Sequence, residues 1–94
     1  MLAMTRVRVP DGEAAAFRTG AEDLLGLLAG MSGFVRGHLG RALDEPDLWV
    51  VSTEWEGVGA YRRALSSYDV KMTAPEALAH AVLEPSAYEV LASR

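Results

Sequence analysis

Apolar and polar residues alternate with a period of two at the start of the chain and then follow a helical period. From Leu2 to Val9, small or apolar side chains occupy every second position, which predicts a strand. From about Gly12 to Ala29, apolar residues recur three and four positions apart, which predicts an amphipathic helix. Asp11 is the expected N-cap of this helix, and Gly30 is its expected C-terminal stop.

Two further strands are predicted in the middle of the chain. The second covers Phe34 to Leu43, and the third covers Leu48 to Glu56, which is rich in β-branched and aromatic residues. The segment Asp44-Glu45-Pro46-Asp47 between them predicts a turn, since these residue types favour turn conformations.

Helical spacing returns after the third strand. Val58 to Ser67 is predicted to be a helix with Tyr61 on its inward face. Thr73-Ala74-Pro75-Glu76 matches a capping box, which predicts that a short third helix starts there. The last strand is predicted over Val82 to Leu91. Because Pro85 cannot donate a hydrogen bond to a neighbouring strand, this strand is expected at a sheet edge.

The order β-α-β-β-α-β predicts a ferredoxin-like α+β fold, in which helices cover one face of an antiparallel sheet. The expected strand order is 4-1-3-2, with the last strand at an edge. At 94 residues, the chain 1–94 is expected to form a single domain. Both faces of the predicted strands carry apolar residues. We therefore expect the open sheet face to pack on a second copy, which would form a dimeric α+β barrel.

Composition narrows the classes of function. Half of the residues are apolar, the formal net charge is −4, and the arginines are scattered, so a nucleic-acid partner is not expected. The absence of cysteine excludes disulfides, thiolate metal sites and a cysteine nucleophile. No apolar run approaches the roughly 18 residues of a membrane span, and no signal pattern is present. We expect a cytoplasmic protein without a membrane partner.

Several short motifs occur at a spacing that is typical of one family. They are Pro10-Asp11-Gly12, Met31-Ser32-Gly33-Phe34, Ser52-Thr53-Glu54-Trp55-Glu56, Tyr61 with Leu65-Ser66-Ser67, and Glu84-Pro85 with Tyr88-Glu89-Val90. With these residues the chain resembles the antibiotic biosynthesis monooxygenase family of small dimeric α+β barrels. The resemblance implies a homodimer with a pocket between sheet and helices in each subunit. It also implies cofactor-free oxidation of polycyclic aromatic phenols, as in some members, or haem degradation, as in others.

Residues that the resemblance assigns to the haem-degrading branch are missing from this chain. The asparagine, tryptophan and histidine of that branch would fall near Thr5, Ala64 and Ala74. A histidine that many members carry in the second helix corresponds to Val70. We therefore expect no cofactor and no metal, and haem binding without the usual turnover is the less favoured alternative.

Three residues are the candidates for catalysis. His38 could take a proton from a phenol, because imidazole titrates near working pH. Trp55 is a candidate wall for a planar substrate, and the Tyr61 hydroxyl could bind a substrate oxygen. Each also has a plain interpretation, as a structural or interface histidine, a core tryptophan and a tyrosine whose ring lies in the core.

Five further residues are candidates for binding the substrate: Thr5, Phe34, Arg36, Ser52 and Tyr68. Alternation along the second strand places Phe34, Arg36 and His38 on one face, where Arg36 could stabilise the anion that His38 generates. His80, late in the predicted third helix, is expected to interact with that helix's C-terminal dipole.

The resemblance implies a cofactor-independent monooxygenase that oxidises a polycyclic aromatic phenol or a related small aromatic molecule with O2. The alternative is a non-catalytic homodimer of the same fold that binds a small molecule or a protein partner. The missing histidines at Val70 and Ala74 favour this alternative. Haem binding is a third interpretation.

Overall fold

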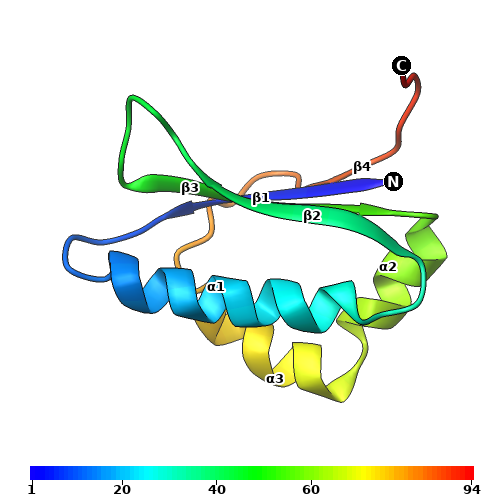
Figure 1. Cartoon of the computed structure of the whole chain (residues 1–94), viewed down its shortest axis with the longest axis horizontal. Coiled ribbons are helices and arrows are strands. Elements are labelled where there is room, and N and C mark those ends of the chain that lie inside the picture. Colours follow the sequence, from blue (N-terminus) through cyan, green and yellow to red (C-terminus); the bar gives the residue numbers. More distant parts are fainter.

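The computed structural model describes residues 1–94 as an antiparallel sheet with helices on one face (Figure 1). The elements in chain order are β1 (Leu2–Arg8), α1 (Ala14–Ala29), β2 (Phe34–Arg41), β3 (Leu48–Trp55), α2 (Val58–Leu65), α3 (Tyr68–Ala77) and β4 (Ala87–Tyr88). All three helices lie below the sheet in Figure 1, so the upper face of the sheet is open. None of the helices has the length and apolarity that crossing a lipid bilayer requires.

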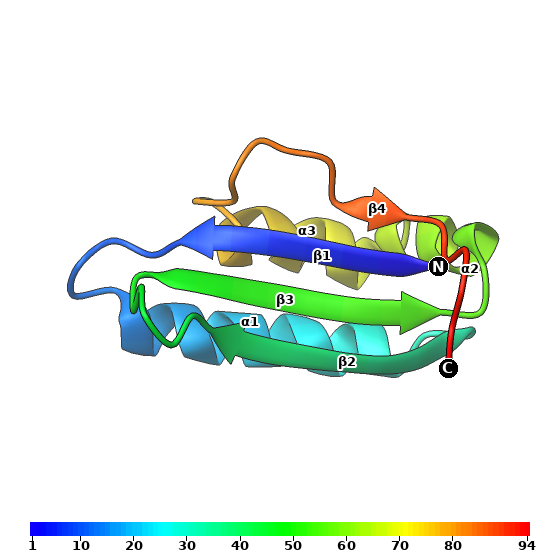
Figure 2. The same ribbon diagram turned by 90° about the horizontal axis from the view of Figure 1, so that it is seen from above.

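The strands lie side by side in the order β2-β3-β1-β4 (Figure 2), which is the predicted order. β1 pairs with β3 over its whole length, from Leu2 opposite Glu54 to Arg8 opposite Leu48. β2 pairs with the other side of β3, and β4 adds two residues beside β1. The predicted ferredoxin-like α+β fold is therefore confirmed.

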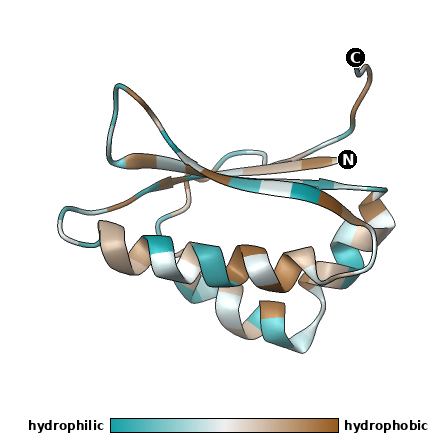
Figure 3. Ribbon diagram, in the orientation of Figure 1, coloured by the Kyte–Doolittle hydropathy of each residue, from teal (hydrophilic) through white to brown (hydrophobic).

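The core lies between the sheet and the helices and has two centres. Along β3, alternate residues are buried against the helices, with Trp55 at one end and Trp49 at the other. Trp55 packs with residues of α1, α2 and α3, whereas Trp49 packs with Val7 and Val9. Hydrophobic and hydrophilic residues are interleaved along the strands and α1 (Figure 3), as expected for elements covered on one face.

The second strand departs from simple alternation. A register shift between Phe34 and Arg36 makes a β-bulge, so Phe34 pairs with Trp55 on the helix side of the sheet. Beyond the bulge, His38 pairs with Ser52 on the open face, and Arg36 lies on that same face. The prediction that Phe34, Arg36 and His38 share one face is therefore wrong, because one extra residue reverses the facing of everything after it.

The third helix begins earlier than predicted. Ser67 is its N-cap, and the Ser67 hydroxyl accepts a hydrogen bond from the Val70 backbone N–H at 3.4 Å. The predicted capping box, residues 73–76, lies inside α3, so the predicted start is wrong. The serine cap and the buried Val70 start the helix first. Pro75 is inside the helix, which ends two residues later at Ala77.

The ends of the chain's elements also differ from the predictions. Glu13, not Asp11, is the N-cap of α1, and it makes no side-chain capping hydrogen bond. The last strand is reduced to Ala87–Tyr88, with an isolated bridge between Val7 and Ala81 before it. After β4 the chain runs away from the sheet on its open side (Figure 1).

Candidate functional site

The predicted aromatic residues form a closed cluster at the β3–α2 end of the core. Trp55 is 1% exposed, and its indole N–H donates a hydrogen bond to Thr53 Oγ1 at 2.9 Å. The ring of Phe34 packs edge-on against Trp55 with centroids 5.3 Å apart, and the Tyr61 ring lies at 5.9 Å. The indole therefore has neither a free surface nor a free donor for a ligand in this conformation.

Tyr61 is half-buried beside this cluster. Burial raises the pKa of the Tyr61 hydroxyl above its usual 10.0, because the charged phenolate would lose hydration. The hydroxyl is therefore protonated at neutral pH and able to donate a hydrogen bond.

His38 lies on the opposite side of the sheet from Trp55. The His38 side chain is exposed on the open face, with Ser52 directly across on β3. On the same face, Arg36 Nε lies 3.2 Å from Glu54 Oε1, so a carboxylate already neutralises this guanidinium. Because the sheet separates them, His38 and Trp55 cannot contact one substrate molecule within a single chain.

Two other predicted binding residues join neither group. Thr5 is half-buried on the helix side of β1, opposite Val51. Tyr68 is the first residue of α3 and is 75% exposed. The structure thus brings Phe34, Trp55 and Tyr61 together, and it brings Arg36, His38 and Ser52 together elsewhere.

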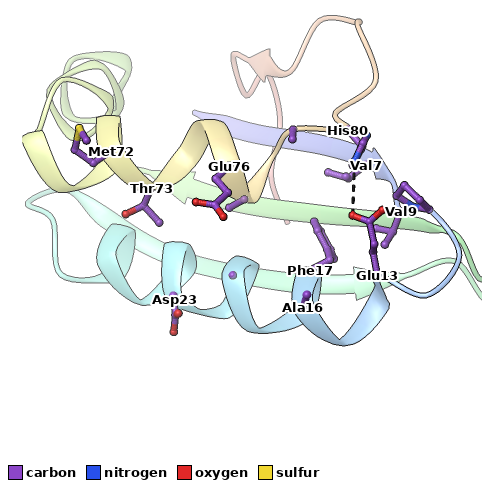
Figure 4. Close-up of a pocket in the computed structure, with 14 residues that line it drawn as sticks. Val7, Val9, Glu13, Ala16, Phe17, Asp23, Met72, Thr73, Glu76 and His80 are labelled. Atoms are coloured by element: carbon purple, nitrogen blue, oxygen red, sulfur yellow. Dashed lines mark ion pairs between the residues drawn. The ribbon is translucent and has the colours of Figure 1, made fainter.

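A cavity of about 540 Å³ lies between α1, α3 and the end of β1 (Figure 4). Phe17 lies on its apolar side in front of Val7 and Val9, which are themselves almost fully buried, and Met72 and Ala77 contribute from α3. The position of Phe17 is fixed by its edge-on contact with Trp49, whose ring centroid is 5.3 Å away. Such an arrangement suits the face of a flat apolar molecule.

Two polar side chains meet at the mouth of this cavity. His80 Nε2 lies 3.9 Å from Glu13 Oε1, and each side chain is more than half exposed. The backbone carbonyl of His80 accepts a hydrogen bond from the Arg8 N–H at 3.1 Å, which fixes the segment after α3 to β1. A neutral imidazole held next to a carboxylate can accept a proton from a substrate, and the carboxylate then stabilises the imidazolium.

The sequence interpretation did not identify His80 as a cavity residue. It placed His80 in the last turn of a helix, but α3 ends at Ala77 and the imidazole lies next to the Glu13 carboxylate. Only the packing of α3 against α1 brings these two side chains together. The only clue to His80 in the sequence was its residue type, since it is one of only two histidines in the chain.

The cavity does not suit haem. Glu13, Asp23 and Glu76 are among its lining residues, whereas none of the lining residues is lysine or arginine. The propionate groups of haem would therefore meet carboxylates, with His80 as the only basic side chain in the lining. No group of three or more histidine, aspartate or glutamate side chains is placed to hold a metal ion.

Comparisons with known proteins agree with the fold. The family model for antibiotic biosynthesis monooxygenase matches residues 1–80. SnoaB, a cofactor-independent oxygenase from Streptomyces nogalater, is 26% identical; the match covers 98% of this chain and 96% of that chain, with a TM-score of 0.78. A comparison with curated proteins finds no match.

Two more distant solved structures share the fold. A putative antibiotic biosynthesis monooxygenase from Nitrosomonas europaea is 15% identical, with 97% of this chain and 98% of that chain covered and a TM-score of 0.77. A conserved protein from Methanosarcina mazei Go1 is 15% identical, with 92% and 84% covered and a TM-score of 0.78. From the family-model match and the fold, this chain belongs to the antibiotic biosynthesis monooxygenase family.

Proposed function

We propose that this chain is a cofactor-independent monooxygenase that oxidises a polycyclic aromatic phenol, or a related small aromatic molecule, with O2. The observation that carries the proposal is the cavity between α1 and α3, with its apolar side and the His80–Glu13 pair at its mouth. The 26% identity to a cofactor-independent oxygenase supports the same class of reaction.

The cavity matches the size and surface that a flat aromatic substrate needs. Its volume of about 540 Å³ is within the usual range for small-molecule sites. Phe17 would offer the ring system an aromatic contact, beside the edges of the nearly buried Val7 and Val9. This placement leaves the phenolic edge of the substrate toward the mouth, where His80 and Glu13 lie.

The proposed chemistry begins with proton removal by His80. Deprotonation makes the aromatic ring electron-rich, so the substrate itself supplies the electrons that reduce O2. For an anthrone, the ring CH2 becomes a carbonyl: one oxygen atom enters the product, and the other leaves as water with the two hydrogens. Glu13 stabilises the imidazolium that forms on His80.

We also propose that the protein is a cytoplasmic homodimer that pairs through the open sheet face. Apolar residues of β1 such as Met4 are uncovered there in the single chain. In this arrangement His38, Ser52 and Arg36 belong to the dimer interface. Trp55 and Tyr61 stabilise the helix layer through core packing.

Oxygen uptake by the purified, metal-free protein with anthrones and polycyclic hydroquinones tests the proposed activity. We expect uptake above the spontaneous rate together with quinone formation. The matched variants are His80→Gln and His38→Gln, which remove one histidine each. Loss of uptake in the first variant alone supports the cavity as the site, and loss in the second alone places the chemistry on the open face.

The second candidate function is non-catalytic binding of a small aromatic molecule by the same homodimer. The closed packing of Trp55 favours it, because residues predicted for catalysis do not meet at a cavity. Ligand binding without oxygen uptake above the spontaneous rate across the substrate panel is the result that this function predicts.

A further inference from the structure

We propose that the cavity between α1 and α3 selects aromatic ligands that carry a positive charge, such as a protonated amine, and rejects those that carry a carboxylate. The inference rests on the proposed function only for the location of the site. It concerns which member of the aromatic substrate class binds there, and it does not require that oxygen reacts.

The first argument is the charge of the lining. Glu13, at the start of α1, and Glu76, on α3, lie on either side of the cavity and point toward the space between the helices (Figure 4). Asp23 also lines the cavity, although its side chain is directed away from α3 (Figure 4). None of the lining residues is lysine or arginine, so a ligand carboxylate has no basic side chain other than His80 to meet.

The second argument is that the chain does not neutralise these carboxylates itself. Glu76 is part of no ion pair, and Glu13 has only His80, at 3.9 Å, which balances its charge only when the imidazole is protonated. The edge of the sheet is different. There, Glu84 is held by two hydrogen bonds from the Arg6 guanidinium. The electrostatic potential at the cavity mouth therefore stays negative, and it would attract a cationic group of a ligand.

The apolar side and the acidic mouth together define the shape of the expected ligand. Its ring system would lie on Phe17 beside the edges of the nearly buried Val7 and Val9, and none of these side chains offers a polar partner. Its charged group would extend to the mouth, between Glu13 and Glu76. At contact distance in an aqueous setting, one pair of opposite charges changes an affinity by about fivefold.

Three ligands with one ring system test the proposal. They are 2-(aminomethyl)anthraquinone, 2-methylanthraquinone and anthraquinone-2-carboxylate, titrated into the full chain at neutral pH while tryptophan fluorescence is recorded. Trp49 is a suitable reporter, because it contacts the cavity residue Phe17. We expect the amine to bind at least about fivefold more tightly than the neutral compound. The carboxylate should bind most weakly. High salt should reduce the differences between the three affinities.

Three variants locate the selectivity. Glu76→Gln and Glu13→Gln should each weaken amine binding by about fivefold and leave the affinity of the neutral compound nearly unchanged. Asp44→Asn is the matched control, because it removes the same charge from the exposed β2–β3 connection outside the cavity lining. The control should leave the order of affinities unchanged.

Several results would overturn the proposal. Equal affinities for the three ligands would do so, as would failure of all three to bind. An effect of Asp44→Asn as large as that of Glu76→Gln would attribute the preference to net charge and not to the cavity. The oxygen assay is independent: charge selection without oxygen uptake contradicts only the proposed oxygenase, and oxygen uptake without charge selection contradicts only this inference.

Discussion

His80 Nε2 and Glu13 Oε1 lie 3.9 Å apart, although one residue follows the third helix and the other precedes the first. The pair exists because α1 and α3 pack next to each other beneath the sheet, with the end of α3 near the start of α1 (Figure 4). It puts a potential base and its stabilising carboxylate at the mouth of an apolar cavity.

Replacing His80 and replacing Glu13 should lower the rate of the proposed oxidation by different amounts. We expect His80→Gln to lower kcat by about 100-fold, because the proton acceptor is lost, with a smaller change in KM. Glu13→Gln keeps the imidazole and should lower kcat by about 10-fold. Steady-state oxygen uptake measures both. A kcat unchanged in His80→Gln would remove His80 from the reaction.

Trp55 should behave as a core residue. Its side chain is 1% exposed and its indole N–H is already bonded to Thr53, so Trp55→Ala should leave a large unfilled space. We expect the free energy of unfolding to fall by about 3–5 kcal/mol, measured by urea denaturation. Tyr68→Ala removes an aromatic ring that is 75% exposed. It should change the free energy of unfolding by less than about 0.5 kcal/mol. Similar losses in the two variants would contradict this assignment.

Gly33 should not tolerate a side chain. Its φ of +87° is in the left-handed region, and an added Cβ would collide with the Cβ of Ala60 on α2. Backbone strain and overpacking together should make Gly33→Ala less stable by about 2–4 kcal/mol.

Gly12 provides the matched control for Gly33. It has a similar φ of +84°, but nothing lies within 4 Å of an added Cβ. The free energy of unfolding of Gly12→Ala should therefore fall only by the cost of backbone strain, about 1–2 kcal/mol. Thermal or urea unfolding of both variants gives the difference. Equal losses would mean that the contact with Ala60 relaxes without cost.

The Arg6–Glu84 pair should contribute to stability in a pH-dependent way. Hydrogen bonds from Arg6 lower the pKa of the Glu84 carboxyl in the folded state below its usual 4.5. A lowered folded-state pKa gives stability that is present above the unfolded value and is lost as the pH falls through the folded one. The stability difference between the native chain and Glu84→Gln should therefore shrink on acidification.

Urea unfolding at about pH 7 and at about pH 3 measures the Glu84 effect. Glu89→Gln is the control, since Glu89 is in no ion pair and follows β4. A difference between native chain and Glu84→Gln that stays constant over this range would contradict the linkage. Because the Arg6 side chain is exposed and the Glu84 side chain is partly exposed, added salt should also reduce this stability difference.

The sequence determined the first three strands, the first two helices and the order of the sheet. Alternation along the predicted strand Leu48 to Glu56 places Trp49 and Trp55 on one face, and both are buried. The spacing of apolar residues by three and four positions in α1 likewise places Leu24 and Leu28 on one side of the helix, where both are buried. These features depend on repeated contacts with near neighbours, so the pattern of residues is enough to predict them.

The tertiary structure decided where the candidate chemistry lies. A bulge before Arg36 puts His38 on the open face, and a serine cap starts α3 ahead of the expected capping box. The meeting of Glu13 and His80 depends on how α1 and α3 pack, which no local spacing encodes. Contacts between distant segments depend on the summed packing of the whole chain. The residues of the cavity could therefore be identified only after folding.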